Sequence, residues 1–279
     1  AVFVDSDPET LQMNLDSIKK AISKKTRAIC MVHVLGNGGY INEVKKLCKS
    51  KNFWLIEDTC ESLGVKKRDK YLGTYGDIGT YSFYFSHHIT TVEGGMIVTN
   101  NDYIANKILS LRSHGWTRDM FDADVYEKQF PEIDPRFLFV NVGYNLRSTD
   151  MNAAIGIVQL KKLERFNQKR HEIGKIWNDA FLPLKKKKLI FPMEITKGTK
   201  ASWFGFPIIC KSQKMRNELR VHLEKNGIET RPIICGNMTK QPGIKNISYK
   251  ISGQLKGADI IMDRGIFWGS SPDMTKKEI

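Results

Sequence analysis

The chain has 279 residues, 41% of them hydrophobic, so it is long enough to bury the core of one large domain or of two smaller ones. Its formal net charge is +14, but its lysine and arginine runs are short, lack interleaved aromatic residues and come with no nucleic-acid-binding motif. We therefore interpret the charge as a solvated surface, or as a field that attracts anionic ligands such as a nucleotide diphosphate, and expect no nucleic-acid partner.

Cysteine spacing and hydropathy exclude further classes of protein. The five cysteines include no CxxC pair, so neither a disulfide framework nor a zinc site is expected, and a cytoplasmic location is the simplest one. No apolar run is long enough to predict a membrane span. The first residues, AVFVDSDPET, read as the start of a strand and not as a signal peptide, which indicates a fragment that lacks the N-terminal part of a longer protein.

The first part of the chain alternates between strand and helix patterns. Helices are expected where apolar residues recur at helical spacing, around 15–22 and 41–48, and strands are expected at 1–5, 27–34 and 53–57. This alternation predicts βαβ units and a mostly parallel sheet flanked by helices, an α/β fold. In such sheets ligands bind beyond the carboxyl ends of the strands.

An acidic residue stands at one of those ends. Asp58 directly follows the strand expected at 53–57, in the string WLIEDTCESLG. An acid at this place is commonly a helix cap or a turn residue. It can instead be the anionic partner that a protonated pyridine ring requires. Spacing alone favours the structural interpretation.

The stretch 79–100, GTYSFYFSHHITTVEGGMIVTN, combines two expected strands with a polar turn. Its ends are rich in aromatic and β-branched residues, which is typical of strands. His87 and His88 are the only side chains of the stretch that titrate near neutral pH. No lysine occurs between Lys70 and Lys107, although lysine is abundant elsewhere in the chain.

This stretch resembles the cofactor segment of the DegT–DnrJ–StrS family, the fold-type-I nucleotide-sugar aminotransferases that use pyridoxal 5′-phosphate. In that family a serine, here Ser82, stands five positions before the lysine that binds the cofactor covalently. A threonine pair and a Gly-Gly pair follow, here 90–91 and 94–95. His87 occupies the position of the lysine. The HHIT string resembles the 3-dehydratase branch of the family, which has a histidine there and uses pyridoxamine 5′-phosphate.

The resemblance implies a function and roles for individual residues. The expected reaction is removal of the C3 hydroxyl from a 4-keto-6-deoxy nucleotide sugar, with His87 as the general base and with glutamate or a similar amino donor restoring the cofactor amine. Asp58 matches the residue that binds the ring nitrogen, and Ser82 matches the cofactor-binding serine. Glu61 matches a position that contacts the ring hydroxyl or the substrate.

The middle of the chain carries a second family signature, VGYNLRSTDMNAAIGIVQL. Asn145 matches a residue that reaches the cofactor phosphate of the partner subunit, which implies a homodimer with a shared active site. The helix that follows, capped by Ser148 or Thr149, is expected to pack into the core through residues 151, 154, 155 and 158.

A helix is expected at 102–113, capped by Asn100 or Asn101. The region between this helix and the one capped by Ser148 or Thr149 lacks the cysteines that hold an iron–sulfur cluster in some members of the dehydratase branch, so no such cluster is expected.

The C-terminal part is expected to form a smaller α+β domain. A long helix at about 166–181 precedes a strand at 201–209 and a helix at 214–226 that ends at Gly227. We therefore predict a large cofactor-binding domain over 1–166, incomplete at its N-terminus, and a smaller domain with its linking helix over 167–279. The string RPIICGNMTKQP resembles a substrate-side loop of the dehydratase branch, which makes Asn237 a candidate substrate contact.

Two alternatives remain open. The first is an ordinary nucleotide-sugar aminotransferase, which would need a lysine in the site. The second is a non-catalytic member of the family in which His87 is simply a lost lysine. The dehydratase interpretation is preferred because Asp58, Ser82, Glu93 and Asn145 all keep their family positions, whereas a decayed site would have lost several of them.

Overall fold

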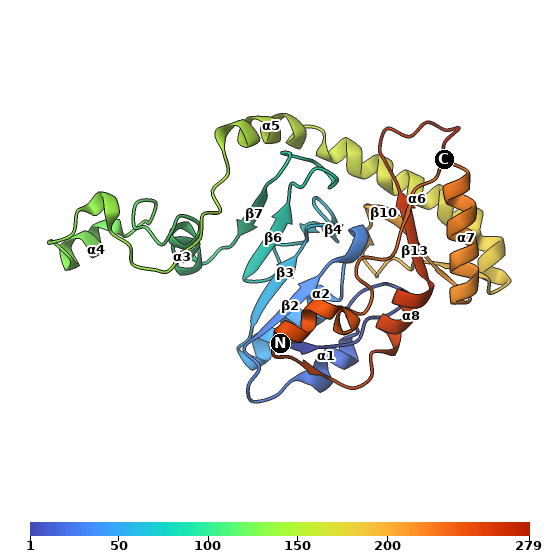
Figure 1. Ribbon diagram of the computed structural model, residues 1–279, viewed down its shortest axis with the longest axis horizontal. Helices are drawn as coiled ribbons and strands as arrows, with labels where there is room; N and C mark the ends of the chain where they lie inside the picture. Colours follow the sequence, from blue (N-terminus) through green and yellow to red (C-terminus); the bar gives the residue numbers. More distant parts are fainter.

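A computed structural model describes all residues from 1 to 279. Its central sheet has four strands in the order β2-β3-β6-β7 (Figure 1). The first three run parallel and β7 runs antiparallel to β6, so the prediction of a mostly parallel sheet is confirmed. The strands are β2 (Ala28–Val32), β3 (Trp54–Asp58), β6 (Ile78–Ser82) and β7 (Gly95–Val98).

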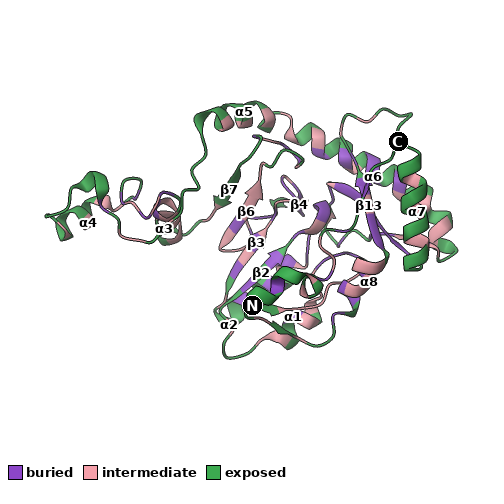
Figure 2. Cartoon of the chain, in the orientation of Figure 1, coloured by how far each residue is buried: buried purple, intermediate pink, exposed green.

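Two helices cover one face of this sheet, α1 (Leu15–Ala21) and α2 (Ile41–Lys51). Alternate residues of a strand point to opposite faces, and Ile29, Met31 and Leu55 point into the cluster that these helices close. The other face of β2 stays exposed (Figure 2). Thus β2 and β3 are held by one packed face, and the carboxyl ends of the three parallel strands β2, β3 and β6 lie at one common edge.

The segment after β7 extends away from the body of the molecule as an arm, at the left of Figure 1. It contains α3 (Asp102–Arg112) and α4 (Ala123–Gln129), and α5 (Asp150–Leu160) then returns along the top. Asn101 caps α3, since its Oδ1 accepts a hydrogen bond from the Ile104 N–H at 3.0 Å. Thr149 caps α5.

The expectation that α5 packs into the core is wrong for the chain as it stands. Met151, Ala154, Ile155 and Val158 are all exposed, and Met151 keeps 77% of its surface open. The amphipathic pattern does form a helix, but no segment of the chain lies over its apolar face (Figure 2). An apolar stripe predicts burial only where a partner surface is present.

The long helix α6 (Leu163–Lys186) leads to a second antiparallel sheet in the order β11-β13-β10-β8. Trp203, Phe206 and Trp268 fill the larger hydrophobic cluster, which Leu11 and Leu35 also join from the N-terminal part. Two helices pack against this sheet, α7 (Gln213–Lys225) and α8 (Lys256–Arg264). Its strands are β8 (Ile190–Pro192), β10 (Gly205–Cys210), β11 (Thr230–Arg231) and β13 (Gly265–Gly269).

Short elements complete the fold. The N-terminal strand β1 (Val2–Phe3) pairs in parallel with β12 (Lys250–Ile251) and does not join the central sheet. A three-stranded sheet combines β4 (Lys66–Lys67), β5 (Lys70–Tyr71) and β9 (Thr199–Lys200). Four 3₁₀ turns lie at Val34–Gly36, Pro135–Phe137, Met238–Lys240 and Pro242–Asn246. No helix combines the length and the apolar character needed to cross a bilayer.

Candidate active site

The carboxyl ends of β3 and β6 place two of the candidate residues at the same edge of the sheet. Asp58 ends β3 and Ser82 ends β6, and the strands pair in parallel with Asp58 opposite Thr80. The Asp58 Oδ1 accepts a hydrogen bond from the Cys60 N–H at 3.1 Å. The Ser82 Oγ accepts one from the Tyr84 N–H at 3.2 Å. Both side chains keep further capacity for a ligand, Asp58 as an acceptor and Ser82 as a donor.

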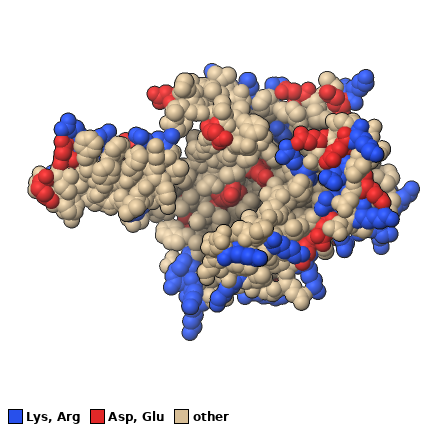
Figure 3. Space-filling model, in the orientation of Figure 1, with Lys and Arg blue, Asp and Glu red and all other residues tan.

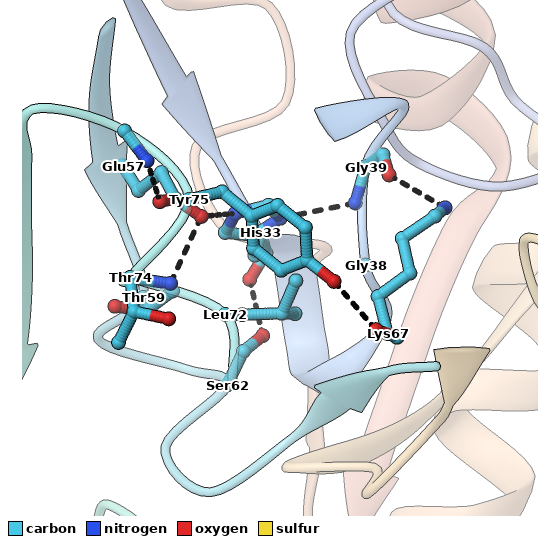
Figure 4. Close-up of polar contacts among 12 residues, drawn as sticks. His33, Gly38, Gly39, Glu57, Thr59, Ser62, Lys67, Leu72, Thr74 and Tyr75 are labelled. Carbon is cyan, nitrogen blue, oxygen red and sulfur yellow. Dashed lines mark hydrogen bonds and ion pairs between the residues drawn. The ribbon is translucent and has the colours of Figure 1, made fainter. Parts of the chain in front are cut away.

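A buried polar network around Glu57 fixes the end of β3 on the face of the sheet opposite to Asp58 (Figure 4). Glu57 and His33 have no exposed surface, and the His33 Nε2 lies 3.1 Å from the Glu57 Oε2. Glu57 also accepts hydrogen bonds from the Gly73 and Gly76 N–H groups, at 2.9 and 2.6 Å. The His33 Nδ1 accepts from the Gly39 N–H at 3.0 Å, so the ring proton of a neutral His33 lies on Nε2 and points at Glu57.

The network lowers the pKa of Glu57 despite its burial. Burial by itself raises that pKa, but the hydrogen bond from His33 and those from the two glycine N–H groups outweigh it. Glu57 therefore stays ionised and holds the loop at 73–76 and the loop at 33–39 against the strand. Asp58, the next residue along the strand, is positioned by this arrangement.

His87 lies in a turn that backbone hydrogen bonds close at its base. The Phe83 N–H donates to the Gly94 O and the Thr91 N–H donates to the Phe83 O, both at 2.9 Å. The imidazole ring meets the rings of Tyr84 and Phe204 edge to face, with centroids at 5.7 and 5.2 Å. Its Nδ1 is buried and has no hydrogen-bond partner, which leaves Nε2 as the nitrogen that is open to a ligand.

Burial lowers the pKa of His87, while the negative charge of Asp58 raises it. The two candidate residues therefore interact across the edge of the sheet, and His87 is neutral at pH 7. Figure 3 shows that this face of the molecule is hollowed in the middle and that carboxylates, with few Lys or Arg side chains, lie in the hollow. A neutral imidazole next to a carboxylate has the properties of a general base.

Glu61 lies in the turn after β3, where its Oε2 accepts a hydrogen bond from the Leu35 N–H at 2.9 Å. Burial, followed by the charge of Asp58, raises the pKa of Glu61 to about 7. The carboxyl group is thus divided between its acid and its base form at neutral pH. Leu35 adopts a left-handed backbone with φ of 52°, which is uncommon for a residue other than glycine.

Asn145 lies apart from this group, on the segment between the arm and α5. Its backbone forms a bridge to Ser113, and its side chain is exposed. Nearby, the guanidinium groups of Arg118 and Arg147 lie over the Trp116 ring, at 4.4 and 5.6 Å from its centroid. The chain therefore does not by itself bring Asn145 to His87.

The side chain of Asn237 is occupied within its own loop. Its Oδ1 accepts hydrogen bonds from the N–H and the hydroxyl of Thr239, at 3.0 and 2.7 Å, and its Nδ2 donates to Asp259 at 2.7 Å. Only one amide hydrogen remains for a ligand. The loop that carries Asn237 lies close enough to Glu61 for its charge to act on Cys235. Burial is the main cause of the raised pKa of Cys235, and the charge of Glu61 raises it further.

Sequence reasoning missed Leu35 and Phe204, which contact the candidate residues directly. Leu35 is an apolar residue in a strained turn, and Phe204 belongs to a strongly apolar stretch, so neither carries a chemical signal in the sequence. Their place beside the candidate residues is shown only by backbone hydrogen bonds between the segment at 35–36 and the segment at 202–204. The Phe204 N–H donates to the Leu35 O at 3.1 Å and the Ser202 N–H donates to the Gly36 O at 3.0 Å.

The fold and the polar residues at the carboxyl edge of its parallel strands fit an enzyme of the pyridoxal-phosphate type, and comparison with known proteins identifies the family. A model of the DegT/DnrJ/EryC1/StrS aminotransferase family matches residues 1–279. The chain belongs to this family.

Its relatives include dehydratases. The chain is 39% identical over 274 residues to the GDP-4-keto-6-deoxy-D-mannose 3-dehydratase of Yersinia pseudotuberculosis, a match that covers 96% of this chain and 68% of that protein.

Solved structures of GDP-4-keto-6-deoxymannose 3-dehydratases have the same fold. One holds a trapped PLP-glutamate geminal diamine; it is 36% identical with a TM-score of 0.86, and the match covers 97% of this chain and 70% of that one. A histidine-to-asparagine variant holds GDP-perosamine, at 36% identity, a TM-score of 0.87 and the same coverage. The fold-type-I aminotransferase-like architecture expected from the sequence is therefore confirmed.

Proposed function

We propose that the protein is a pyridoxamine-phosphate-dependent 3-dehydratase of a 4-keto-6-deoxy nucleotide sugar, with His87 as its general base, in deoxysugar or polysaccharide biosynthesis. The observation that carries this proposal is the histidine in the position of the cofactor lysine. It is neutral, open at Nε2 and electrostatically coupled to Asp58. An imidazole cannot bind the cofactor aldehyde covalently as a lysine amine does, but it can move a proton at neutral pH.

The residues at the edge of the sheet fit the cofactor. Asp58 retains acceptor capacity for the protonated ring nitrogen, Ser82 retains a hydroxyl hydrogen for the phosphate, and Glu61 can share a proton with the ring hydroxyl. When bound, pyridoxamine phosphate supplies the amine that combines with the C4 ketone of the sugar and an electron sink for the elimination.

The protein's own residues supply binding and proton transfer. Asp58 holds the ring nitrogen in its protonated form. The Nε2 of His87 accepts the proton that leaves the cofactor C4′ and donates it to the departing C3 hydroxyl, so one imidazole serves both steps. The rings of Tyr84 and Phe204 hold the imidazole edge-on and exclude water from its Nδ1. Glutamate as the amino donor is consistent with the adduct in the related dehydratase.

The active site is proposed to be shared between two copies of the chain. Asn145 of one copy would contact the cofactor phosphate of the other. This assignment is supported by the exposed apolar side chains around it, which include Val142 at 96% exposure and Met151 at 77%. Apolar patches of this kind mark interfaces.

We also propose a cytoplasmic location for the protein. The chain is proposed to divide into a cofactor-binding domain over 1–166 and a smaller domain over 167–279, and Asn237 is proposed to contact the substrate.

The test is product analysis. The protein is incubated with pyridoxamine phosphate, glutamate and GDP-, CDP- or dTDP-linked 4-keto-6-deoxy sugars, and the products are analysed by mass. A 3-deoxy product supports the proposal. A 4-amino sugar supports the aminotransferase alternative, and the absence of turnover with bound cofactor supports the non-catalytic one.

Two substitutions of His87 separate these outcomes further. His87→Asn should lower the rate by about 10²–10⁴-fold, as expected for loss of a general base, while the cofactor still binds. A near-normal rate would exclude the proposed role. His87→Lys should allow borohydride to attach the cofactor covalently and should shift the products towards transamination. Borohydride attachment in the unsubstituted protein would instead show that another lysine serves the site.

A further inference from the structure

A buried cation lies behind the histidine pair, on the linking helix α6. Arg170 is only 7% exposed and forms no ion pair with a carboxylate at bonding distance. Burial lowers the pKa of its guanidinium to about 10, although the charge of Asp273 opposes this. Burying a charge without a paired anion is costly, so the contacts of this group require an explanation.

The guanidinium holds backbone carbonyls from two segments that are distant in sequence. Its Nη1 donates to the Phe204 O and to the Ser270 O, both at 3.0 Å, and it lies 3.3 Å from the Trp203 O. The hydroxyl of Ser270 also donates to the Trp203 O. Arg170 therefore ties the segment before β10 to the segment after β13, and its Nε remains buried without a partner.

The segment that Arg170 holds forms one wall of the histidine turn. The ring of Phe204 meets His87 edge-on at 5.2 Å. The Ser202 O lies 3.1 Å from the Nε2 of the buried His88, and because a carbonyl only accepts, this nitrogen carries the proton. Both histidines thus rest on residues whose backbone is fixed from behind by one guanidinium.

We propose that Arg170 is a positioning residue for His87: it fixes the Ser202–Phe204 wall that orients the imidazole. This inference rests on the proposed function, in which His87 is the general base. Arg170 cannot be a catalytic residue itself, because it contacts backbone carbonyls and not the ligand side of the turn.

The charges around the two histidines agree with this role. His88 faces Arg170 from α6 and His87 from its own turn, and burial, followed by the charge of Arg170, lowers the pKa of His88 to about 3. His87 faces Asp58 from β3. A proton on His88 would place a second cation next to the general base and lower its proton affinity. Burial is the main reason that His88 stays uncharged, and the charge of Arg170 adds to this effect.

The experiment compares Arg170→Gln, which removes the charge, with Arg170→Lys, which keeps the charge but loses the planar donor group. The histidines of the ¹⁵N-labelled protein are titrated by NMR without cofactor, and kcat and KM are measured with the nucleotide sugar. Both variants should lower kcat by about 10–100-fold, as for a misplaced catalytic group, with KM within about twofold. Only Arg170→Gln should raise the pKa of His88.

The control is Trp177→Phe, on the same helix, which removes the hydrogen bond from the Trp177 Nε1 to the Ile279 O at 2.9 Å. It should lower stability but leave kcat and the histidine titrations unchanged. If the Arg170 variants do not fold, Ser270→Ala serves instead, and it should change the His87 signal and lower kcat in the same direction. Unchanged histidine titrations and unchanged kcat in these variants would overturn the proposal.

The two proposals can fail separately. The NMR titration uses neither cofactor nor substrate, so it tests the positioning role directly. If product analysis excludes His87 as the base while the titrations still respond to Arg170, the proposed function is wrong and the structural coupling stands. If the titrations do not respond while the His87 variants behave as expected, only the role of Arg170 is wrong.

Discussion

Replacing Glu57 by Gln should destabilise the protein although the two side chains have the same shape. The Oε1 of Glu57 accepts a hydrogen bond from the Gly76 N–H, and its Oε2 accepts from the Gly73 N–H and from His33. An amide has only one acceptor oxygen, so in either orientation its NH₂ group faces a buried N–H donor. His33 cannot compensate by moving its proton to Nδ1, because Nδ1 accepts from the Gly39 N–H.

The magnitude follows from the number of bonds lost. In the more favourable orientation of the amide in the Glu57→Gln variant, only the hydrogen bond from the Gly76 N–H is lost, and that N–H is left without a partner. Hydrogen bonds to a charged group are worth about 1.5–3 kcal/mol each. We therefore expect Glu57→Gln to lower the free energy of unfolding by about 2–3 kcal/mol. Glu57→Ala, which removes all three acceptor contacts, should cost about 3–5 kcal/mol.

Urea denaturation at pH 7, followed by circular dichroism, measures both changes. Glu127→Gln on the exposed arm is the matched control, because this side chain is exposed and forms no ion pair; it should change stability by less than about 0.5 kcal/mol. The pKa of Glu57 is lowered in the folded state, so its contribution is present above the ordinary carboxyl range and is lost as the pH falls through the lower folded value. A Glu57→Gln variant as stable as the control would refute the reasoning.

Four further predictions concern the site and its surroundings. The acid limb of the kcat/KM profile should lie below the ordinary histidine value of 6.5, since the base form of His87 is required and burial lowers its pKa; a midpoint well above 7 would contradict this. The protein should lose about 1.4 kcal/mol of stability for each pH unit between about 6.5 and about 3, because the unfolded chain protonates His88 before the folded chain does; His88→Gln should flatten that dependence in denaturation experiments. Gly36→Ala should destabilise by at least about 2 kcal/mol, because Gly36 has φ of 88° and an added Cβ would overlap the Ser202 carbonyl; a thermal melt equal to that of the unsubstituted protein would show the contact to be dispensable. Met151→Lys should shift the protein towards monomer in sedimentation experiments while the monomer remains folded, since this side chain is exposed in the single chain; an unchanged association state would count against the proposed interface.

Local sequence pattern predicted most of the elements, because their signals are local. Apolar spacing located α1 and α2, and the caps Asn101 and Thr149 were among the residues expected to begin α3 and α5. The strand before Asp58 was expected from the same patterns, and in the structure Asp58 is its last residue; the end of β6 at Ser82 was not predicted. The extent of α6 was underestimated: it begins at Leu163 and continues through Pro183 to Lys186.

The apolar face of α5 shows where pattern alone fails. Met151, Ala154, Ile155 and Val158 have helical spacing, and that spacing is the same whether the face packs within one chain or against another. Their exposure is a property of the tertiary structure. The same holds for the distance between Asn145 and the other candidate residues, which no local signal contains.

The sequence by itself, through its resemblance to the family, led to the proposal that His87 stands at the position of the family's lysine, and with it to the kind of chemistry that an imidazole can perform. The tertiary structure decided the protonation behaviour of the site. The pKa values of His87 and Glu61 depend on burial and on the charge of Asp58, and the orientation of the imidazole depends on Phe204 and on the guanidinium of Arg170 behind it. These groups are far apart in the sequence, and electrostatic interactions depend on distance in space and on exclusion of water, which only the folded chain defines.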